Sequence, residues 1–118
     1  MARRRYEEGL HIACVQALRA MSPTTLFWHV PNGGLRTKAQ AAMFARMGVL
    51  AGVPDLEIIT IDGKPVWVEL KALKGRLTVG QELFKEHVES IGLRVFVVRS
   101  TGEFLSLINQ LKKEGALP

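Results

Sequence analysis

Cysteine and long apolar runs are scarce in this sequence of 118 residues. The one cysteine, Cys14, cannot form an internal disulfide, and no signal-peptide pattern opens the chain, so we expect a reducing cytoplasm. Every apolar stretch is interrupted by glycine, proline or charge well before the ~18 residues that a membrane span needs. These shortages argue against a disulfide scaffold and a membrane protein. Because Cys14 lies in an apolar run, we predict a buried core thiol, not a nucleophile.

Acidic residues are also few, with 11 Asp and Glu against 16 Lys and Arg, which gives a formal charge of +5. This balance favours a polyanionic partner, although basic charge alone is weak evidence for one. Hydrophobic residues make up 47% of the chain, which suffices for a core. We expect one domain over residues 1–118.

Four segments have the spacing of apolar residues that is typical of amphipathic helices. Thr37 and Thr78 precede two of them and are expected to be N-caps, and Gly48 is expected to end one. The third segment is predicted to bury Leu83, Phe84, Val88 and Ile91. The predicted helices cover residues 6–20, 39–47, 79–91 and 101–113.

Four other segments are rich in β-branched and aromatic residues, as strands are. Two of them are separated by Asp62-Gly63, a hairpin turn signal, and are predicted to be antiparallel. The last has a continuous apolar centre, which predicts an interior strand covered on both faces. The predicted strands cover residues 26–30, 55–61, 65–71 and 93–99. The order αβαββαβα predicts an α/β fold with a mixed four-stranded sheet flanked by helices.

Three charged residues of the predicted hairpin are expected to converge. Glu69 and Lys71 share one face of their strand because alternate residues point the same way, and Asp55 begins the strand beside them. We expect two carboxylates without histidine or cysteine beside them, which are hard oxygen ligands suited to Mg²⁺, for which Mn²⁺ can substitute. We predict a catalytic metal centre at Asp55, Glu69 and Lys71. The alternative is an ordinary exposed charge pair beside a strand start.

The spacing from Pro54-Asp55 to Glu69-Leu70-Lys71 resembles the active-site signature of the PD-(D/E)XK nuclease superfamily. Flanking motifs resemble more closely its VRR-NUC family, in particular the stand-alone bacterial and phage members. The resemblance runs from Glu7 to about Phe104. The motifs that carry it are His29-Val30-Pro31-Asn32-Gly33-Gly34, Met47-Gly48, Gly52-Val53-Pro54-Asp55-Leu56, Glu69-Leu70-Lys71, Gly75-Arg76-Leu77-Thr78 and Gln81.

This resemblance implies a restriction-endonuclease-like core and divalent-metal-dependent cleavage of branched DNA, at four-way junctions or flaps, by a homodimer. It makes Asp55 and Glu69 metal ligands and Lys71 the catalytic lysine. It adds the Leu70 carbonyl as an oxygen donor, Glu7 as an acid that reaches the site, and Gln81 as an organising residue. Glu8 beside Glu7 leaves the register open, and His11 stands where many relatives carry glutamine.

Several basic and glycine positions are candidates for contacting DNA phosphates. Glycines allow close backbone approach, and basic side chains add affinity that falls with salt. An ordinary turn and solvated surface charges are the alternatives. Arg3, Arg4 and Arg5 are expected to be mobile without nucleic acid. The candidates are Asn32, Gly33, Gly34, Arg36, Lys38, Lys74, Arg76, Arg3, Arg4 and Arg5.

A few other side chains leave two interpretations open. His29 either has its hydrogen bonds satisfied at a strand end or faces the site. Trp28 and Trp67 are predicted to lie in the core or in an interface. Two other functions use the same sequence features: a nuclease on unbranched DNA in phage DNA processing or restriction, and a non-catalytic DNA-binding module. The intact charged triad argues against the second.

Overall fold

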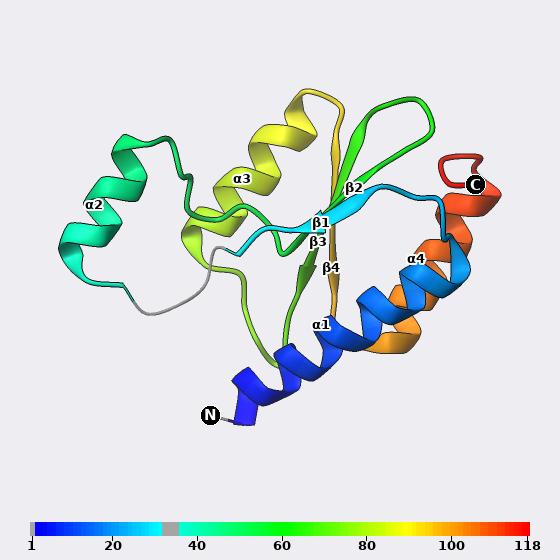
Figure 1. Ribbon diagram of the computed structural model, residues 1–118, viewed down its shortest axis with the longest axis horizontal. Coiled ribbons are helices and arrows are strands. Elements are labelled where there is room, and N and C mark those ends of the chain that lie inside the picture. The colour runs from blue at the N-terminus through cyan, green and yellow to red at the C-terminus, as the bar shows by residue number, and fades with distance from the viewer. Residues whose placement is uncertain (1, 32–35) are drawn as a thin grey trace.

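The computed structural model describes residues 2–31 and 36–118 as a four-stranded mixed sheet with four helices (Figure 1). This confirms the predicted α/β class and the predicted order of elements. The elements are α1 (Ala2–Met21), β1 (Phe27–His29), α2 (Lys38–Arg46), β2 (Leu56–Ile59), β3 (Pro65–Leu70), α3 (Val79–Ser90), β4 (Arg94–Val98) and α4 (Thr101–Lys113).

The strands lie in the order β1-β2-β3-β4, with β1, β2 and β3 antiparallel in turn and β4 parallel to β3. The β2–β3 hairpin turns at Gly63, whose φ of 85° is readily accessible to glycine. Leu56 pairs with Val68, so Asp55, the residue before β2, comes beside the end of β3. The predicted hairpin is therefore confirmed, and it positions the candidate site.

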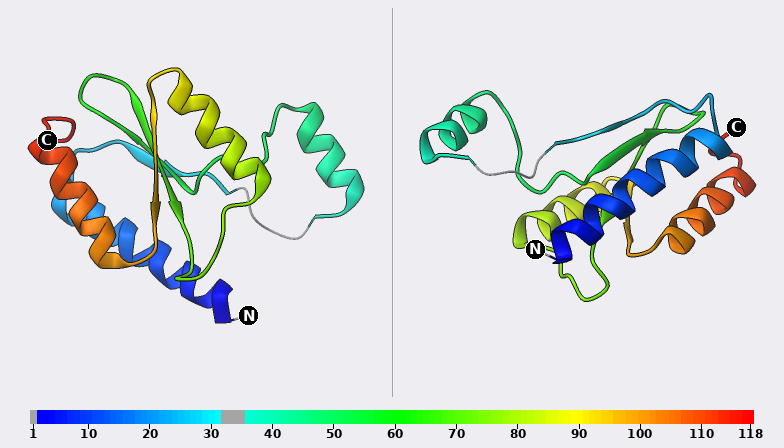
Figure 2. Two further views of the ribbon diagram at one scale, coloured as in Figure 1. Left: turned by 180° about the vertical axis from the view of Figure 1, so that it is seen from behind. Right: turned by 60° about the horizontal axis from the view of Figure 1, so that its bottom comes forward.

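Two apolar layers cover the sheet because side chains along β3 alternate between its faces. On one face α1 and α4 pack over Val68, with Cys14 and Phe104 fully buried. On the other, α3 packs over Trp67, whose ring meets that of Phe84 edge-to-face at a centroid distance of 5.1 Å. Figure 2 shows α1 and α4 lying side by side. The core placements predicted for Cys14 and Trp67 are confirmed.

The prediction that the last strand is interior was wrong. β4 is an edge strand with β3 as its one partner among the described strands. Its apolar run has another cause: α3 covers Val95 and α4 covers Val98, so an edge strand is shielded on both faces. The stripe predicted for α3 was half right, since Val88 is buried but Leu83 and Ile91 are 60% and 65% exposed.

The first helix begins earlier than predicted, and the arginines expected to be mobile lie in its first turns. Arg4 pairs with Glu8 one turn on at 3.2 Å, and the Tyr6 hydroxyl donates to the Arg99 carbonyl at 2.6 Å. These contacts extend the helix to Ala2, because each stabilises the N-terminal turns.

The second helix stands apart from the rest of the molecule (Figure 1). As predicted, Thr37 caps it, in a capping box with Gln40, and Gly48 follows its end with a φ of 93°. Within the described chain, α2 packs against no other helix or strand, and all its residues are exposed. Among the described residues, no helix is both long and apolar enough to cross a membrane.

Candidate active site

Asp55 lies where three strands come together. Its carbonyl accepts hydrogen bonds from the Val30 N–H and from Nδ1 of His29, both at 2.8 Å. Its carboxylate Oδ2 accepts from the Leu70 N–H at 2.8 Å. The main chain of Asp55 is thereby tied to the end of β1, and its side chain is tied to the end of β3.

Glu69 is a buried carboxyl group, with 5% of the residue exposed. Its Oε1 accepts a hydrogen bond from Nε2 of Gln81 at 3.1 Å. Burial, followed by the charge of Asp55 and a hydrogen bond with its carboxyl, raises the pKa of Glu69 to about 9, whereas Lys71 opposes the shift. The Asp55 and Glu69 carboxyls are thus in contact where little water reaches them, and two negative charges would repel there.

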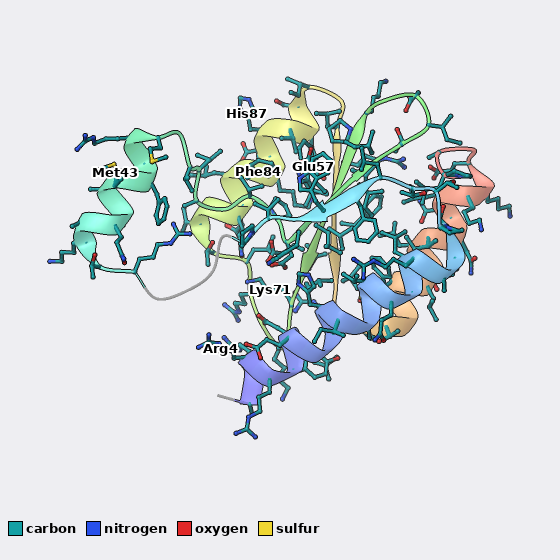
Figure 3. All side chains as sticks on the ribbon, viewed as in Figure 1. Arg4, Met43, Glu57, Lys71, Phe84 and His87 are labelled. Atoms are coloured by element: carbon teal, nitrogen blue, oxygen red, sulfur yellow. The ribbon has the colours of Figure 1, made fainter. Side chains whose placement is uncertain are left out.

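Lys71, just after β3, and Glu7 on α1 act on this pair. The Lys71 main-chain N–H donates to the Val98 carbonyl at 3.0 Å, the residue is half-buried (Figure 3), and its positive charge lowers the pKa of Glu69. Glu7 accepts from the Ala72 N–H at 2.9 Å and also raises the pKa of Glu69. Glu8 points away to Arg4. Glu7 is therefore the acid of α1 that lies at the site.

Gln81 is held by the cap of α3. Its Oε1 accepts from the Thr78 N–H at 2.8 Å, and the Thr78 hydroxyl accepts from the Gln81 N–H at 3.2 Å. Since the cap occupies the amide oxygen, the amide nitrogen is directed at Glu69. The predicted N-cap at Thr78 is confirmed, and the capping box explains how Gln81 is oriented.

The loop before β2 is pressed against the start of α3. Gly52 has a φ of 93°, and a Cβ at this position would lie 2.4 Å from the carbonyl carbon of Gly80. Only glycine tolerates both conditions. This contact brings Asp55 and Gln81 to the same end of the sheet, so the glycine in the Gly52-Val53-Pro54-Asp55 motif has a packing reason.

The donor set fits a hard divalent cation. Two carboxyls in contact, one of them buried and held protonated, are a costly arrangement that a cation between them would relieve. A third carboxylate, Glu7, and the ammonium of Lys71 complete the surroundings. The five residues that the structure brings together are Glu7, Asp55, Glu69, Lys71 and Gln81.

The predicted DNA-contact residues are spread more widely. Arg36 lies over the Phe44 ring at 4.5 Å, and Lys38 opens the detached α2, so both are away from the carboxyl pair. Lys74 and Arg76 are exposed on the loop between β3 and α3 that follows Lys71. Asn32, Gly33 and Gly34 lie outside the described residues.

Sequence reasoning missed Arg99, which organises that loop. Its Nη1 donates to the carbonyls of Ala72 and Gly75, at 2.7 and 2.6 Å. A guanidinium with several donors can hold a loop by its carbonyls, whereas the position of Arg99 at the end of a strand carries no such signal. The loop after Lys71 is thus fixed to β4.

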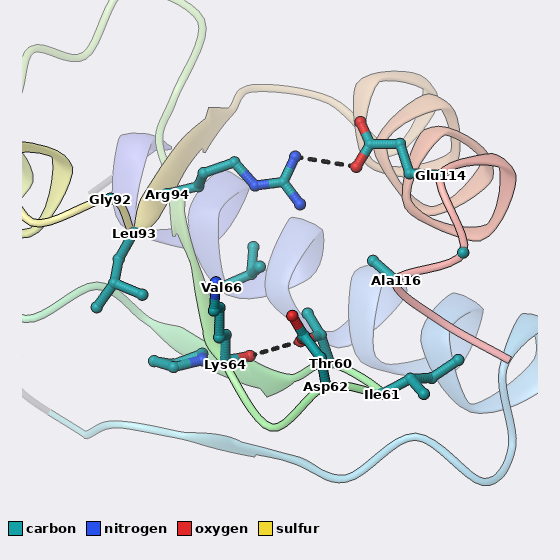
Figure 4. Close-up of a pocket in the computed structure, with 12 residues that line it drawn as sticks. Thr60, Ile61, Asp62, Lys64, Val66, Gly92, Leu93, Arg94, Glu114 and Ala116 are labelled. Carbon is teal, nitrogen blue, oxygen red and sulfur yellow. Dashed lines mark hydrogen bonds and ion pairs between the residues drawn. The ribbon is translucent and has the colours of Figure 1, made fainter.

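A separate hollow lies between the hairpin turn, the start of β4 and the end of α4 (Figure 4). Three of the four charged residues that line it have local partners: Arg94 pairs with Glu114 at 3.0 Å, and the Thr60 hydroxyl donates to Asp62. It lies at the turn end of the β2–β3 hairpin, opposite the carboxyl pair, and we assign it no role in the site.

Glu69→Gln is expected to flatten the pH dependence of stability in metal-free protein. Because the folded pKa of about 9 exceeds the ordinary value of 4.5, the folded state holds a proton that the unfolded state releases between these values. Stability conferred by the protonated form is present below pH 4.5 and is lost as pH rises through 9, by at most about 1.4 kcal/mol per pH unit. Denaturant unfolding in EDTA from pH 5 to 8.5 measures this slope. Parallel profiles for wild type and variant, with Glu86→Gln as the exposed control, would contradict the assignment.

Comparisons with known proteins identify a family and a fold. The model of the VRR-NUC domain family matches residues 6–102. A solved structure described as a VRR_NUC domain protein has 23% sequence identity and a TM-score of 0.68, with 92% of each chain covered. That likeness shows a shared fold. A comparison with curated protein sequences found no match.

Proposed function

Because the chain belongs to the VRR-NUC family, we propose that it is a divalent-metal-dependent endonuclease that hydrolyses phosphodiester bonds of DNA. The observation that carries this proposal is the buried contact between Glu69 and Asp55, with Lys71 beside it. Such a strongly perturbed carboxyl, next to a second carboxyl and an ammonium, is typical of catalytic centres.

In this proposal Asp55 and Glu69 hold Mg²⁺, for which Mn²⁺ substitutes, and the Leu70 carbonyl and Glu7 supply further oxygen atoms. The bound ion supplies Lewis-acid chemistry at the phosphate and lowers the pKa of an attacking water. Lys71 stabilises negative charge that develops on the phosphoryl oxygens. Gln81 keeps the Glu69 carboxylate in one orientation.

The role of Gln81 can be separated from its role in the helix cap. Gln81→Glu keeps an oxygen for the Thr78 N–H but replaces the donor to Glu69 by a like charge, so we expect 10- to 100-fold weaker Mg²⁺ activation, roughly the effect of losing a group that orients a metal ligand. Thr78→Ala is the control, since it weakens the same cap and keeps the amide. Mg²⁺ titrations of DNA cleavage that are equal for Gln81→Glu and wild type would exclude this role.

Basic residues near the site are proposed to bind DNA without reading its sequence. Lys74 and Arg76 follow the proposed catalytic strand, and Arg3, Arg4 and Arg5 lie on the turns of α1 that precede Glu7. Their exposed charges would neutralise phosphates and release counterions, so affinity would fall steeply with salt. Arg36, Lys38 and the segment from Asn32 to Gly34 are further candidates for backbone contacts.

We further propose a homodimer in which α2 of one copy packs on α3 of the other. Among the exposed residues of this region, Met43 and Phe44 of α2 and Met47 just after it are 47%, 37% and 71% exposed. On α3, Val79 and Leu83 are 72% and 60% exposed. Each helix therefore leaves part of its apolar surface outside the core.

Charge favours the same pairing. Residues 36–54 contain Arg36, Lys38 and Arg46 but no acidic residue, whereas α3 exposes Glu82, Glu86 and Glu89. A two-fold axis would make the contact twice, basic helix on acidic helix each time. Two centres in one dimer would suit a four-way junction, in which two strands must be cut.

Mass measurement in solution tests the dimer. Wild type is expected at twice the 13.1 kDa chain mass, and Met47→Glu is expected to be monomeric, because it places an acid opposite the acidic α3. Ile12→Glu, at an exposed apolar position of α1, is the matched control and is expected to stay dimeric. A monomeric wild type, or loss of the dimer only in Ile12→Glu, would contradict the interface.

A substrate panel tests the activity and its selectivity. Wild type and Lys71→Ala are incubated with labelled linear duplex, flap and four-way-junction DNA, in Mg²⁺, Mn²⁺ or EDTA. Metal-dependent cleavage that favours branched DNA and requires Lys71 supports the proposal. Equal rates on all three substrates would point to a nuclease for unbranched DNA, and binding without cleavage to a non-catalytic module.

A further inference from the structure

A second group of possible metal ligands lies beside the carboxyl pair. One ring nitrogen each from His11 and His29 and one carboxylate oxygen of Asp55 lie within 4.8 Å of one another. The two imidazole rings meet edge-to-face, with centroids 4.3 Å apart and an interplanar angle of 89°. The group joins the middle of α1, the end of β1 and the residue before β2.

The hydrogen bonding of His29 prepares it to be a ligand. Its Nδ1 lies 2.8 Å from the Asp55 carbonyl, which can only accept, so in the neutral ring Nδ1 carries the proton and Nε2 keeps its lone pair. Histidine ligands of metals commonly donate their other ring N–H to a carbonyl in this way. The bond thus sets both the tautomer and the direction of the ring.

His11 is also placed to be a ligand. It is half-buried on α1, and its ring lies against that of His29. Among the described residues, the His11 ring has no hydrogen-bond partner, and its ring contact is with His29. Two imidazoles and a carboxylate form a ligand set that a borderline metal ion prefers.

We propose that His11, His29 and Asp55 bind a first-row transition-metal ion, such as Zn²⁺, at a site distinct from the all-oxygen site of Asp55 and Glu69. Two nitrogens and one oxygen disfavour Mg²⁺, which prefers oxygen ligands, and favour Co²⁺ or Zn²⁺. Asp55 belongs to both sites and couples them. The inference shares Asp55 with the proposed function but does not require DNA cleavage.

Co²⁺ is the probe, because its visible absorption reports nitrogen ligands directly. Untagged protein, stripped with EDTA, is titrated with Co²⁺, followed by Zn²⁺ or Mg²⁺. We expect one equivalent of Co²⁺ with a visible band that Zn²⁺ removes and an equal concentration of Mg²⁺ does not. His11→Gln and His29→Gln should each weaken Co²⁺ binding at least about 10-fold.

Two control variants make the result specific. His87→Gln removes the remaining histidine, which lies exposed on α3, and should bind Co²⁺ as wild type does. Glu69→Gln removes a ligand of the oxygen site alone and should keep the band, whereas Asp55→Asn should lose it. Wild-type binding by both His11→Gln and His29→Gln, or loss of the band in His87→Gln, would overturn the site. Loss of the band in Glu69→Gln would show a single shared site and would also overturn it. Absence of DNA cleavage with the band intact would affect only the proposed function.

Discussion

Asp55→Asn is expected to reduce metal-dependent DNA cleavage by at least about 10²- to 10³-fold, the scale of losing one group that stabilises transition-state charge. The asparagine oxygen can still accept from the Leu70 N–H, so the link between β2 and β3 survives. What is lost is a negative charge for the cation. Single-turnover rates at saturating Mg²⁺ measure the effect.

Stability separates this effect from misfolding. Asp55 raises the pKa of Glu69 by repulsion, so the variant without metal should be at least as stable as wild type. Asp62→Asn is the matched control, because Asp62 is an exposed carboxylate in the turn at the far end of the same hairpin. An Asp55→Asn protein that cleaves at the wild-type rate would show that this carboxylate is not needed.

Gly52→Ala is expected to produce the largest loss of stability, about 2–5 kcal/mol, which combines a left-handed alanine with overpacking. The new Cβ would lie 2.4 Å from the Gly80 main chain, and backbone cannot turn aside as a side chain can. The start of α3 must then move, and Gln81 moves with it. Denaturant unfolding gives the stability, and Mg²⁺ titration of cleavage gives the effect on the site.

Gly48→Ala is a close control for this prediction. Gly48 has the same φ of 93°, but a Cβ there meets nothing within 4 Å. Gly48→Ala should therefore lower the free energy of unfolding by only about 1 kcal/mol, the cost of a left-handed backbone conformation. Equal losses for the two variants would mean that the close approach of Gly52 to Gly80 contributes nothing.

Local signals in the sequence predicted most of the fold. Caps at Thr37 and Thr78 and the turn at Gly63 depend on residues within three or four positions, so they can be recognised without the fold. The edge position of β4 could not be predicted from the sequence, because a run of apolar residues indicates burial and not the number of neighbouring strands. The isolation of α2 was equally hidden, since a well-capped helix need not have a packing partner.

The residues of the candidate site also fall into two groups, those that local sequence signals predict and those that only the fold reveals. The spacing of Asp55 and Glu69 along a hairpin is local, and strand alternation suffices to bring them together. The choice of Glu7 over Glu8 needs the angle at which α1 crosses the end of β3, and the loop contacts of Arg99 need the position of β4. His11 and His29 are 18 positions apart in the sequence, and no spacing rule predicts that their rings are in contact.

The Mg²⁺ dependence of cleavage tests the central proposal most directly. EDTA-stripped wild type and Glu69→Gln are titrated with Mg²⁺ on a mixture of labelled linear, flap and four-way-junction DNA, so that the outcome does not depend on substrate preference. The expected result is no cleavage in EDTA, a saturable rise for wild type, and none for Glu69→Gln. Cleavage by wild type in EDTA, or by Glu69→Gln at the wild-type rate, would contradict a metal-dependent centre at Asp55, Glu69 and Lys71.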